Sequence, residues 1–375
     1  MKQKLDYISQ KLDELKNQNL YRSLKHVKIN GPFITIGTKK LVNFCSNDYL
    51  GLSGQKITPK QLQSSSRLVS GNDESFIKLE KKLSAHKSKE SALVFPTGYM
   101  ANLGAIPALI DDNSTIFSDE LNHASIIEAC RLSNAKVQVY RHNDVDDLRK
   151  KIIKTKSRKF IITEGIFSMD GDFVNLSEIS EIAQKTDSVT IIDDAHGDFT
   201  VGKDGKGTPN HFGIKNVDVY ISSLSKGLGS FGGYVASTKP VIDLCINKAR
   251  SFIYTSALPS FLVELSLSRL KQDRKKSQRR LEQNVSQLSS GLKQIGYDIK
   301  SKTHIIPIII GNEKKTLEFG RFMYNNGIFA QPIRYPTVPK NSARLRVSVT
   351  AWLSKTQIDD ALSIFEKAGK KFDLF

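Results

Sequence analysis

Cysteine is scarce in this sequence. Its 375 residues include only Cys45, Cys130 and Cys245, which lie far apart and form no Cys-x-x-Cys pair. Three dispersed cysteines provide no disulfide framework, and the spacings typical of zinc fingers and iron–sulfur sites are absent as well. We therefore predict no metal site and a reducing compartment, in which each cysteine acts as a small apolar side chain.

Long apolar segments are also missing. No segment approaches the roughly 18 apolar residues that cross a bilayer. The first 20 residues, MKQKLDYISQKLDELKNQNL, carry charges throughout and lack the apolar centre of a signal peptide. We therefore expect a cytoplasmic protein without a membrane partner.

Acidic residues are outnumbered by basic ones. The chain has 56 Lys and Arg against 38 Asp and Glu, which gives a net charge of +18. Such an excess is compatible with nucleic acid, a membrane surface or a polyanionic substrate. The two densest basic runs, 150–159 and 271–280, lack the interleaved aromatic residues of single-strand binders. We interpret them as solvated surface and expect no nucleic-acid partner; a basic nucleic-acid-binding protein on an inactive fold is the alternative from another class.

Regular strand and helix patterns fill most of the sequence. Residues 1–20 predict an amphipathic helix, and residues 33–37 and 41–46 predict short strands. Between residues 74 and 240, β-rich runs alternate with helix-like segments, which is typical of parallel βαβ units in a sheet covered on both faces. The β-rich runs are 92–95, 114–117, 136–140, 159–163, 189–193, 217–222 and 233–237.

The pattern changes after about residue 255. A long helical stretch (260–295), two β-rich runs (305–310 and 344–351) and two further helices (314–326 and from Thr356) predict a separate α+β domain. The expected fold class is α/β, with a mostly parallel central sheet, helices on both faces and a smaller α+β C-terminal domain. The expected domains are residues 1–45, 46–254 and 255–375.

Four short motifs follow predicted strands. Asp193 and His196 stand at the end of one strand, where ligands gather in doubly wound sheets. Lys226, flanked by small residues, follows another strand; it could be a Schiff-base lysine, a phosphate-binding lysine or a plain surface lysine, whereas a Walker A loop is excluded. Thr97-Gly98 opens a helix and could cradle a phosphate or simply cap that helix, and His123 could be a structural histidine.

Together these motifs provide what pyridoxal phosphate (PLP) requires. A lysine forms an imine, a carboxylate pairs with the pyridine nitrogen, helix-end amides hold a phosphate and a flat ring covers the cofactor. The order of the motifs along the chain is that of fold-type I PLP enzymes. The sequence resembles the α-oxoamine synthase family over residues 20 to 355. The matching segments are 46–52 (SNDYLGL), 66–72 (SRLVSGN), 121–125 (LNHAS), 163–172 (TEGIFSMDGD), 193–197 (DDAHG), the Lys226 segment and 344–346 (RLR).

This resemblance implies a role for each residue that contacts the cofactor ring. Lys226 would hold PLP covalently and later move the Cα proton of the substrate. Asp193 would pair with the pyridinium nitrogen, and His123 would stack on the ring. His196 and Ser168 would hydrogen-bond the phenolic oxygen of the ring.

The resemblance also implies how the phosphate is held. The backbone at Gly98 and Tyr99 would bind the phosphate together with Ser223. Thr255 or Ser256 would add a phosphate contact from the other subunit of a homodimer, because family active sites lie at a dimer interface.

The substrates follow from the same resemblance. Arg346 would clamp the amino-acid carboxylate, and Asn47 and Arg22 would line the substrate entrance. Among family members, the sequence most resembles those that condense L-alanine with pimeloyl-CoA, releasing CoA and CO2 and giving 8-amino-7-oxononanoate for biotin biosynthesis. Members that use glycine (2-amino-3-ketobutyrate CoA ligase, 5-aminolevulinate synthase) or serine (serine palmitoyltransferase) are the alternatives within the family, because no single residue distinguishes alanine from them.

Overall fold

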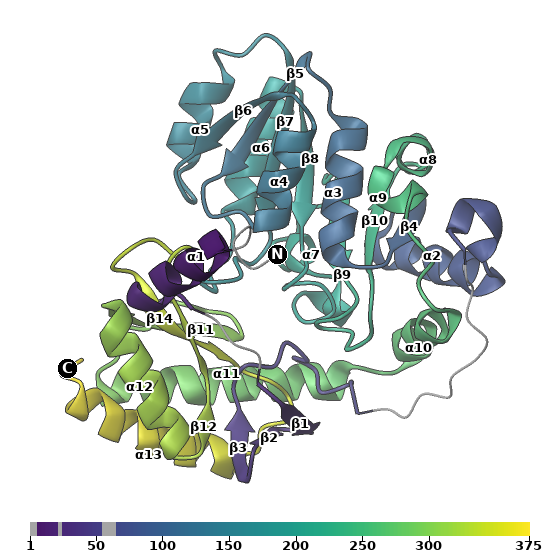
Figure 1. The fold of residues 1–375 in the computed structure, drawn as a ribbon. Coiled ribbons are helices and arrows are strands. Elements are labelled where there is room, and N and C mark those ends of the chain that lie inside the picture. Colours follow the sequence, from purple (N-terminus) through teal and green to yellow (C-terminus); the bar gives the residue numbers. More distant parts are fainter. Residues whose placement is uncertain (1–5, 22–24, 55–64) are drawn as a thin grey trace. The chain divides into compact units, whose positions relative to one another are not determined.

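The computed structural model describes residues 6–21, 25–54 and 65–375, which form two compact units (Figure 1). The central unit consists of Asn47–Ser168 and Asp172–Arg280. The terminal unit combines Met1–Ser46, Met169–Gly171 and Leu281–Phe375. None of the helices in the described ranges is both long and apolar enough to cross a membrane.

A seven-stranded sheet forms the centre of the central unit. Its order is β4 (Ser91–Phe95), β10 (Gly233–Ser237), β9 (Val219–Ser223), β8 (Ser188–Asp193), β7 (Arg158–Glu164), β5 (Ser114–Asp119) and β6 (Lys136–Tyr140). Only β10 runs antiparallel to its neighbours, and the remaining pairs are parallel. Each strand expected between residues 92 and 237 is present, and the predicted mostly parallel sheet is confirmed.

Helices cover both faces of this sheet because adjacent strand residues point to opposite sides. Ile161 and Ile192 belong to one buried cluster, while their neighbours Ile162 and Ile191 belong to the other. The first cluster includes residues of α2 (Glu74–Lys87), α5 (Val145–Ile152), α6 (Leu176–Thr186) and α10 (Ser260–Lys271). The second includes residues of α3 (Gly98–Leu109), α4 (Ala124–Leu132), α8 (Lys239–Lys248) and α9 (Arg250–Ile253). A short helix, α7 (Thr208–His211), follows β8.

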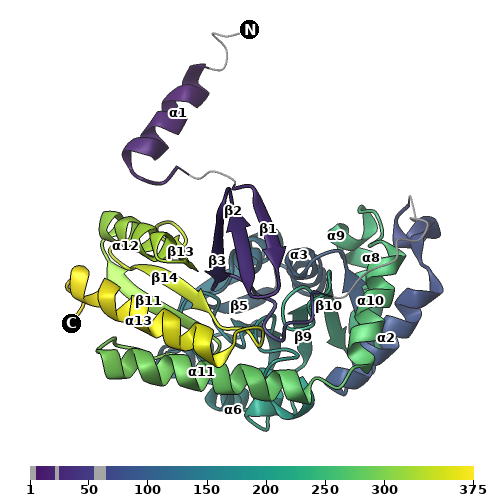
Figure 2. The same ribbon diagram turned by 90° about the horizontal axis from the view of Figure 1, so that it is seen from below.

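The terminal unit contains two small sheets and long helices (Figure 2). One sheet has the order β1 (Val27–Asn30), β2 (Phe33–Ile36), β3 (Lys39–Asn43) and β12 (Ile328–Phe329). The other has the order β11 (Ile305–Gly311), β14 (Ala343–Ser348) and β13 (Gln331–Ile333). The helices are α1 (Asp6–Asn17), α12 (Glu313–Asn325), α13 (Lys355–Lys371) and most of α11 (Lys275–Ile295). The predicted N-terminal helix is therefore present in the described residues.

The unit boundaries differ from those expected from the sequence. The N-terminal strands join the C-terminal unit, since Val42 of β3 pairs in parallel with Ile328 of β12. Helix α10 stays in the central unit because its Val263 shares a buried cluster with Phe76 of α2. The stretch 260–295 is two helices rather than one, and the chain changes unit at Arg280, not at residue 255. These long-range pairings leave no mark in local sequence patterns.

Candidate active site

The predicted catalytic residues follow the ends of parallel strands of the central sheet, at an edge that we call the carboxyl edge. Asp193 ends β8, and Lys226 follows β9. The Lys226 Nζ lies 2.9 Å from Nε2 of His196. Because parallel strands end at the same edge, residues 30 positions apart in sequence meet there.

Tyr49 extends this contact into a hydrogen-bonded chain. Its hydroxyl lies 2.7 Å from Nδ1 of His196 and donates to Oδ1 of Asn47 at 3.0 Å. Because the Tyr49 hydroxyl donates to Asn47, the Nδ1–H of His196 donates to Tyr49, and Nε2 accepts a hydrogen bond from Lys226. This chain fixes the imidazole beside the lysine amine.

Asp193 is buried and held by two donors. Its Oδ1 accepts from the backbone N–H of Ala195 at 3.0 Å, and its Oδ2 accepts from Nδ2 of Asn102 at 2.6 Å. The same amide group of Asn102, on α3, also donates to Oγ of Ser125 at 3.0 Å. The carboxylate is therefore fixed in orientation before any ligand binds.

A second buried carboxyl group stands beside Asp193. Glu164, the last residue of β7, is the register partner of Asp193 on β8. Burial, together with the charge of Asp193, raises the pKa of Glu164 well above its usual value, against the effect of Lys226. The neutral form of Glu164 is thus favoured, and Asp193 lies next to a carboxyl group that does not compete with it for positive charge.

His123 caps α4 and presents a neutral ring. Its Nδ1 accepts from the backbone N–H of Ser125 at 3.2 Å, and the edge of Tyr99 approaches the ring at a centroid distance of 6.0 Å. Burial lowers the pKa of His123; the charge of Lys226 adds to this effect, and Asp193 opposes it. A neutral flat ring is suited to stacking on a cofactor.

A candidate phosphate cradle lies at the start of α3. Thr97 caps this helix by accepting the N–H of Met100 at 3.1 Å, which leaves the N–H groups of Gly98 and Tyr99 at its positive end. A Cβ built on Gly98 would lie 3.2 Å from Cβ of Ser223, so glycine allows these two segments to approach closely. The predicted phosphate-binding residues of β9 and α3 are therefore adjacent.

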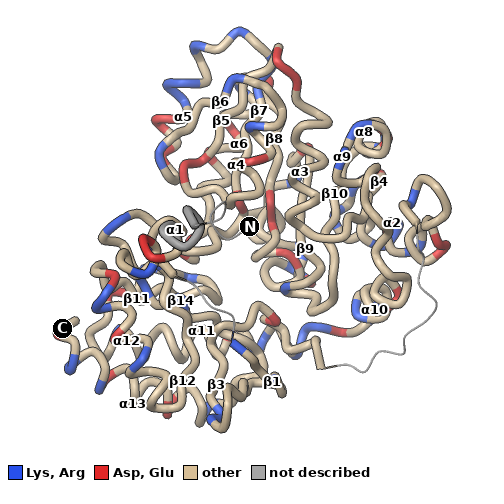
Figure 3. The backbone as a smooth tube through the Cα atoms, in the orientation of Figure 1, with Lys and Arg blue, Asp and Glu red and all other residues tan. Residues whose placement is uncertain are grey.

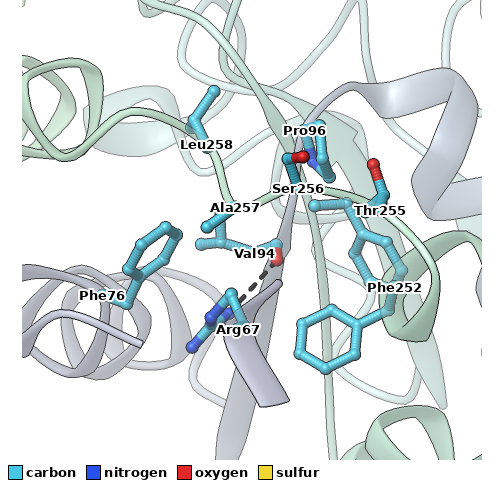
Figure 4. A pocket seen from close by; sticks show the side chains of 10 residues that line it. Arg67, Phe76, Val94, Pro96, Phe252, Thr255, Ser256, Ala257 and Leu258 are labelled. Atoms are coloured by element: carbon cyan, nitrogen blue, oxygen red, sulfur yellow. Dashed lines mark hydrogen bonds between the residues drawn. The ribbon is translucent and has the colours of Figure 1, made fainter. Parts of the chain in front are cut away.

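Thr255 and Ser256 lie at a small pocket beside Pro96 (Figure 4). The pocket has a volume of about 10 Å³, which is room for a single water molecule. At one side of it, Arg67 donates to the carbonyl oxygen of Val94 at 3.3 Å. This pocket is too small for a cofactor. Because Pro96 also lines it, Thr255 and Ser256 lie close to the segment that leads into the phosphate cradle of the same chain.

The other predicted residues have the following positions. Arg346 belongs to β14 of the terminal unit, where it donates to Oγ of Ser348 at 2.7 Å. Ser168 is buried in the central unit and directly precedes the Met169–Gly171 segment of the terminal unit. Arg22 lies outside the described residues. The roles of these three residues stay predictions.

Three residues of the site were not assigned by sequence reasoning: Tyr49, Asn102 and Glu164. Each stands within a quoted or neighbouring motif, but none has a local signal that assigns it a partner. Asn102, for example, is 91 positions from Asp193, and only the packing of α3 against the sheet brings them together. The sequence therefore predicted candidate reactive groups but not the side chains that hold them.

The residues present fit PLP. A primary amine, a fixed carboxylate, a neutral imidazole and helix-end amides match the aldehyde, ring nitrogen, ring face and phosphate of that cofactor. The buried oxygens Oδ1 of Asn102 and Oε1 of Glu164 have no hydrogen-bond partner in the described structure, as expected where a polar ligand completes a site. The fold and the site define a PLP-dependent transferase of fold type I.

Comparisons with known proteins specify the family. Residues 39–365 match the model of the aminotransferase class I and II family, and the chain belongs to this family. The chain is 41% identical to the curated 8-amino-7-oxononanoate synthase of Thermoanaerobacter pseudethanolicus, with 99% of this chain and 98% of that protein covered.

Solved structures share the fold. A serine palmitoyltransferase structure with PLP bound has a TM-score of 0.92 at 25% identity and covers 100% of this chain and 99% of that one. The crystal structure of 8-amino-7-oxononanoate synthase from Francisella tularensis has a TM-score of 0.76 at 28% identity, with coverage of 89% and 99%.

The basic run at 150–159 contributes to a different feature; Figure 3 shows Lys and Arg positions in blue around α5. We call this feature the amino-edge groove because its lining residues lie where β5, β6 and β7 begin. The groove has a volume of about 700 Å³. Its lining residues are Asp112, Asn113, Ser114, Thr115, Lys136, Gln138, Lys150, Lys151, Lys154, Thr155, Lys156 and Ser157. The five lysines that line this groove thus lie at the edge of the central sheet opposite to Lys226.

Proposed function

We propose that this protein condenses L-alanine with pimeloyl-CoA in a PLP-dependent reaction of biotin biosynthesis, and that 8-amino-7-oxononanoate, CoA and CO2 are the products. One observation carries this proposal. The Lys226 amine, linked to His196, lies at the same strand edge as the fixed carboxylate of Asp193. The chain that presents these groups is 41% identical, over nearly its whole length, to a curated synthase of that product.

Lys226 performs the proton transfers. Bound PLP supplies an electron sink that stabilises negative charge at the amino-acid Cα. The Nζ of Lys226 removes the Cα proton and later returns a proton to the product. Since Nε2 of His196 lies 2.9 Å from this nitrogen, the imidazole orients the amine and can share its proton.

Asp193 supplies negative charge for the ring nitrogen of the cofactor. An opposite charge at hydrogen-bond distance favours the protonated form of that nitrogen. The 2.6 Å hydrogen bond from Asn102 fixes the carboxylate, and the neutral ring of His123 offers a flat face. The site therefore arranges its electrostatics before the reaction, which is the main contribution of protein to such chemistry.

The remaining groups hold the phosphate of the cofactor and the two substrates. The N–H groups of Gly98 and Tyr99 and the hydroxyl of Ser223 bind the phosphate, while Arg346 binds the alanine carboxylate through a two-pronged contact. Asn47, together with Arg22, lines the entrance for the acyl-CoA. During the reaction a bond forms between the alanine Cα and the acyl carbon, the C–S bond of the thioester breaks, and the alanine carboxylate leaves as CO2.

The functional unit is a homodimer in which Thr255 or Ser256 reaches the phosphate of the other subunit. An exposed apolar patch beside these residues supports this arrangement. Tyr254 is 74% exposed and Val69 is 80% exposed, and their segments are adjacent because Ala257 donates to the carbonyl oxygen of Ser65. Exposed apolar patches of this kind mark protein interfaces. Light scattering of Val69→Asp should report a monomer, whereas the wild type should be a dimer.

A substrate matrix tests the reaction. CoA release should be measured with alanine, glycine and serine against acyl-CoA thioesters of different length, and alanine with pimeloyl-CoA should give the highest kcat/KM. Lys226→Ala should abolish release, because it removes the amine that holds the cofactor and moves the Cα proton. Full activity of that variant would refute the assigned role. A preference for glycine or serine would show that the protein catalyses the reaction of another family member.

A second function is favoured by one observation, the lysine-rich amino-edge groove. A protein that binds nucleic acid through this groove would be colourless after purification and would shift DNA with a steep salt dependence. The proposed enzyme should instead be yellow, and borohydride should fix the cofactor on Lys226. Mass spectrometry of the reduced peptide distinguishes the two functions.

A further inference from the structure

A cluster of buried charges that the proposed reaction does not use lies beside the turn Asp193–Asp198. Lys87, the last residue of α2, is buried, with 1% of its side chain exposed. Its Nζ lies 2.6 Å from Oδ1 of Asp198 and 3.4 Å from Oδ2 of Asp194. One ammonium group therefore contacts the two carboxylates that bracket His196.

Asp198 anchors one end of this turn. Its Oδ2 accepts hydrogen bonds from Oγ of Ser222 at 2.9 Å and from the hydroxyl of Tyr234 at 2.5 Å. Its Oδ1 lies 2.9 Å from Nε2 of His86. Burial by itself would raise the pKa of Asp198, but the charge of Lys87 and the contacts with His86 and Lys87 lower it below the usual range. Asp198 is thus an ionised group with every lone-pair direction in use.

Asp194 anchors the other end. Its Oδ2 accepts from the backbone N–H of Thr208 at 3.0 Å. Its Oδ1 fills a slot between Gly165 and Gly197, where a Cβ would lie 2.5 Å or 2.3 Å away, so only glycine fits at either position. The carbonyl oxygen of Asp194 also accepts the N–H of Asp198 at 2.8 Å, which closes the turn.

Residues of one turn therefore face two different environments. Asp194 and Asp198 contact Lys87, whereas Asp193 contacts Asn102 and His196 contacts Lys226. Burial of an ion pair is costly and adds little to the free energy of unfolding, and in some proteins such pairs instead specify geometry. The contribution of this cluster is accordingly one of position.

We infer that Lys87 is a positioning residue for the proposed reaction: by holding Asp194 and Asp198, its ammonium fixes the turn that presents Asp193 and His196 to the cofactor and to Lys226. This inference rests on the proposed function. It extends the site to a helix that contributes no side chain to the carboxyl edge.

The first test compares Lys87→Met with Lys82→Met, which removes an exposed lysine of the same helix. Both variants are studied as holoenzymes at a temperature at which circular dichroism shows them folded. Lys87→Met should lower kcat about tenfold or more while the KM for alanine changes less than about twofold, since misplaced groups affect the reacting atoms more than substrate binding. The pH midpoint of the cofactor absorbance should shift by about 0.5 unit or more. Lys82→Met should change none of these quantities.

A second variant covers the case in which Lys87→Met does not fold. Asp194→Asn keeps the Lys87–Asp198 pair and removes one of the two charges that Lys87 binds. It should shift the same absorbance midpoint and lower kcat in the same direction. Folded variants with wild-type kcat and wild-type midpoint would overturn the inference, and so would an equal shift in Lys82→Met.

Failure of the proposed function can be recognised separately. A wild-type protein that binds no PLP and releases no CoA would refute that function. The position of His196 can then be tested in the cofactor-free protein by NMR titration of ¹³C-labelled histidines, with His196→Gln to assign the signal. Lys87→Met should shift the His196 titration, while Lys82→Met should not; an unchanged titration would overturn the inference.

Discussion

The carboxyl edge and the amino-edge groove belong to one sheet, yet they use charge in opposite ways. At the carboxyl edge a few charged groups are buried, and each is fixed by named donors or acceptors, as Asp193 is by Asn102 and Ala195. In the groove, five lysines line an open surface where water and salt screen their charge. An interaction is stronger where water is excluded. The comparison shows that burial and fixed partners, rather than the number of charges, mark the candidate site.

The largest expected effect separates the two edges directly. Asp193→Ala should lower kcat for CoA release about 10³-fold, because it removes the charge proposed to face the ring nitrogen and one of the two acceptors of the Asn102 amide. Asp112→Ala in the groove is the matched control and should stay within about twofold of the wild type. Comparable losses in both variants would show that the two edges do not differ.

The next effect concerns stability at the carboxyl edge. His142 lies 2.9 Å from both Asp119 and Asp172. Burial lowers the pKa of His142, but the hydrogen bonds and charges of these two carboxylates outweigh it and raise the pKa to about 10. A raised pKa stabilises the folded state fully below about pH 6.5, and this stabilisation is lost as pH rises toward 10.

His142→Asn should therefore reduce the free energy of unfolding by about 2 kcal/mol at pH 6 and by much less at pH 10. Urea unfolding at both pH values measures the difference. His26→Asn, at an exposed position of the terminal unit, is the control and should leave the pH dependence unchanged. A loss in His142→Asn that is equal at both pH values would contradict the charged state of this imidazole.

A smaller effect concerns the group that holds Asp193. Asn102→Ala should lower kcat about tenfold and leave the KM for alanine nearly unchanged, since the carboxylate keeps its charge but loses its 2.6 Å donor. Steady-state kinetics with alanine and pimeloyl-CoA measure this split. Asn113→Ala, in the groove, should have no effect. A large rise in the KM for alanine instead would place Asn102 against the substrate.

The smallest effect is expected from the groove. Lys150→Glu/Lys154→Glu should change the KM for the acyl-CoA less than about twofold, because these lysines lie at the edge opposite to Lys226.

Higher salt should still raise the KM for the acyl-CoA more than the KM for alanine, because the net charge of +18 attracts the polyanionic CoA. An equal effect of salt on both substrates would remove this role for the basic charge.

Much of the central unit could be read from local patterns. Apolar β-rich runs such as 159–163 and 189–193 predicted buried parallel strands, and both lie within the observed β7 and β8. The unit boundary could not be read in this way. Val263 of α10 resembles any apolar helix residue, and only its packing with Phe76 assigns the helix to the central unit.

The residues of the candidate site also differ in whether the sequence could predict them. Lys226, Asp193, His196 and His123 stand out in sequence because reactive residue types follow strand ends, where parallel sheets collect their ligands. Lys87 has no such signal: it is one of many lysines, and the structure distinguishes it by its burial against Asp194 and Asp198.

The sequence by itself determined which strands form in the central sheet and, through its family, which chemistry the protein serves, and it predicted the lysine and the carboxylate of the site. The tertiary structure decided which groups hold them: Tyr49 beside His196, Asn102 on Asp193, and Glu164 paired in register with that carboxylate. The reason is physical. Strand and helix propensities act over a few neighbouring residues, whereas hydrogen bonds and burial join residues far apart in the chain, such as Tyr49 and His196, which are 147 positions apart.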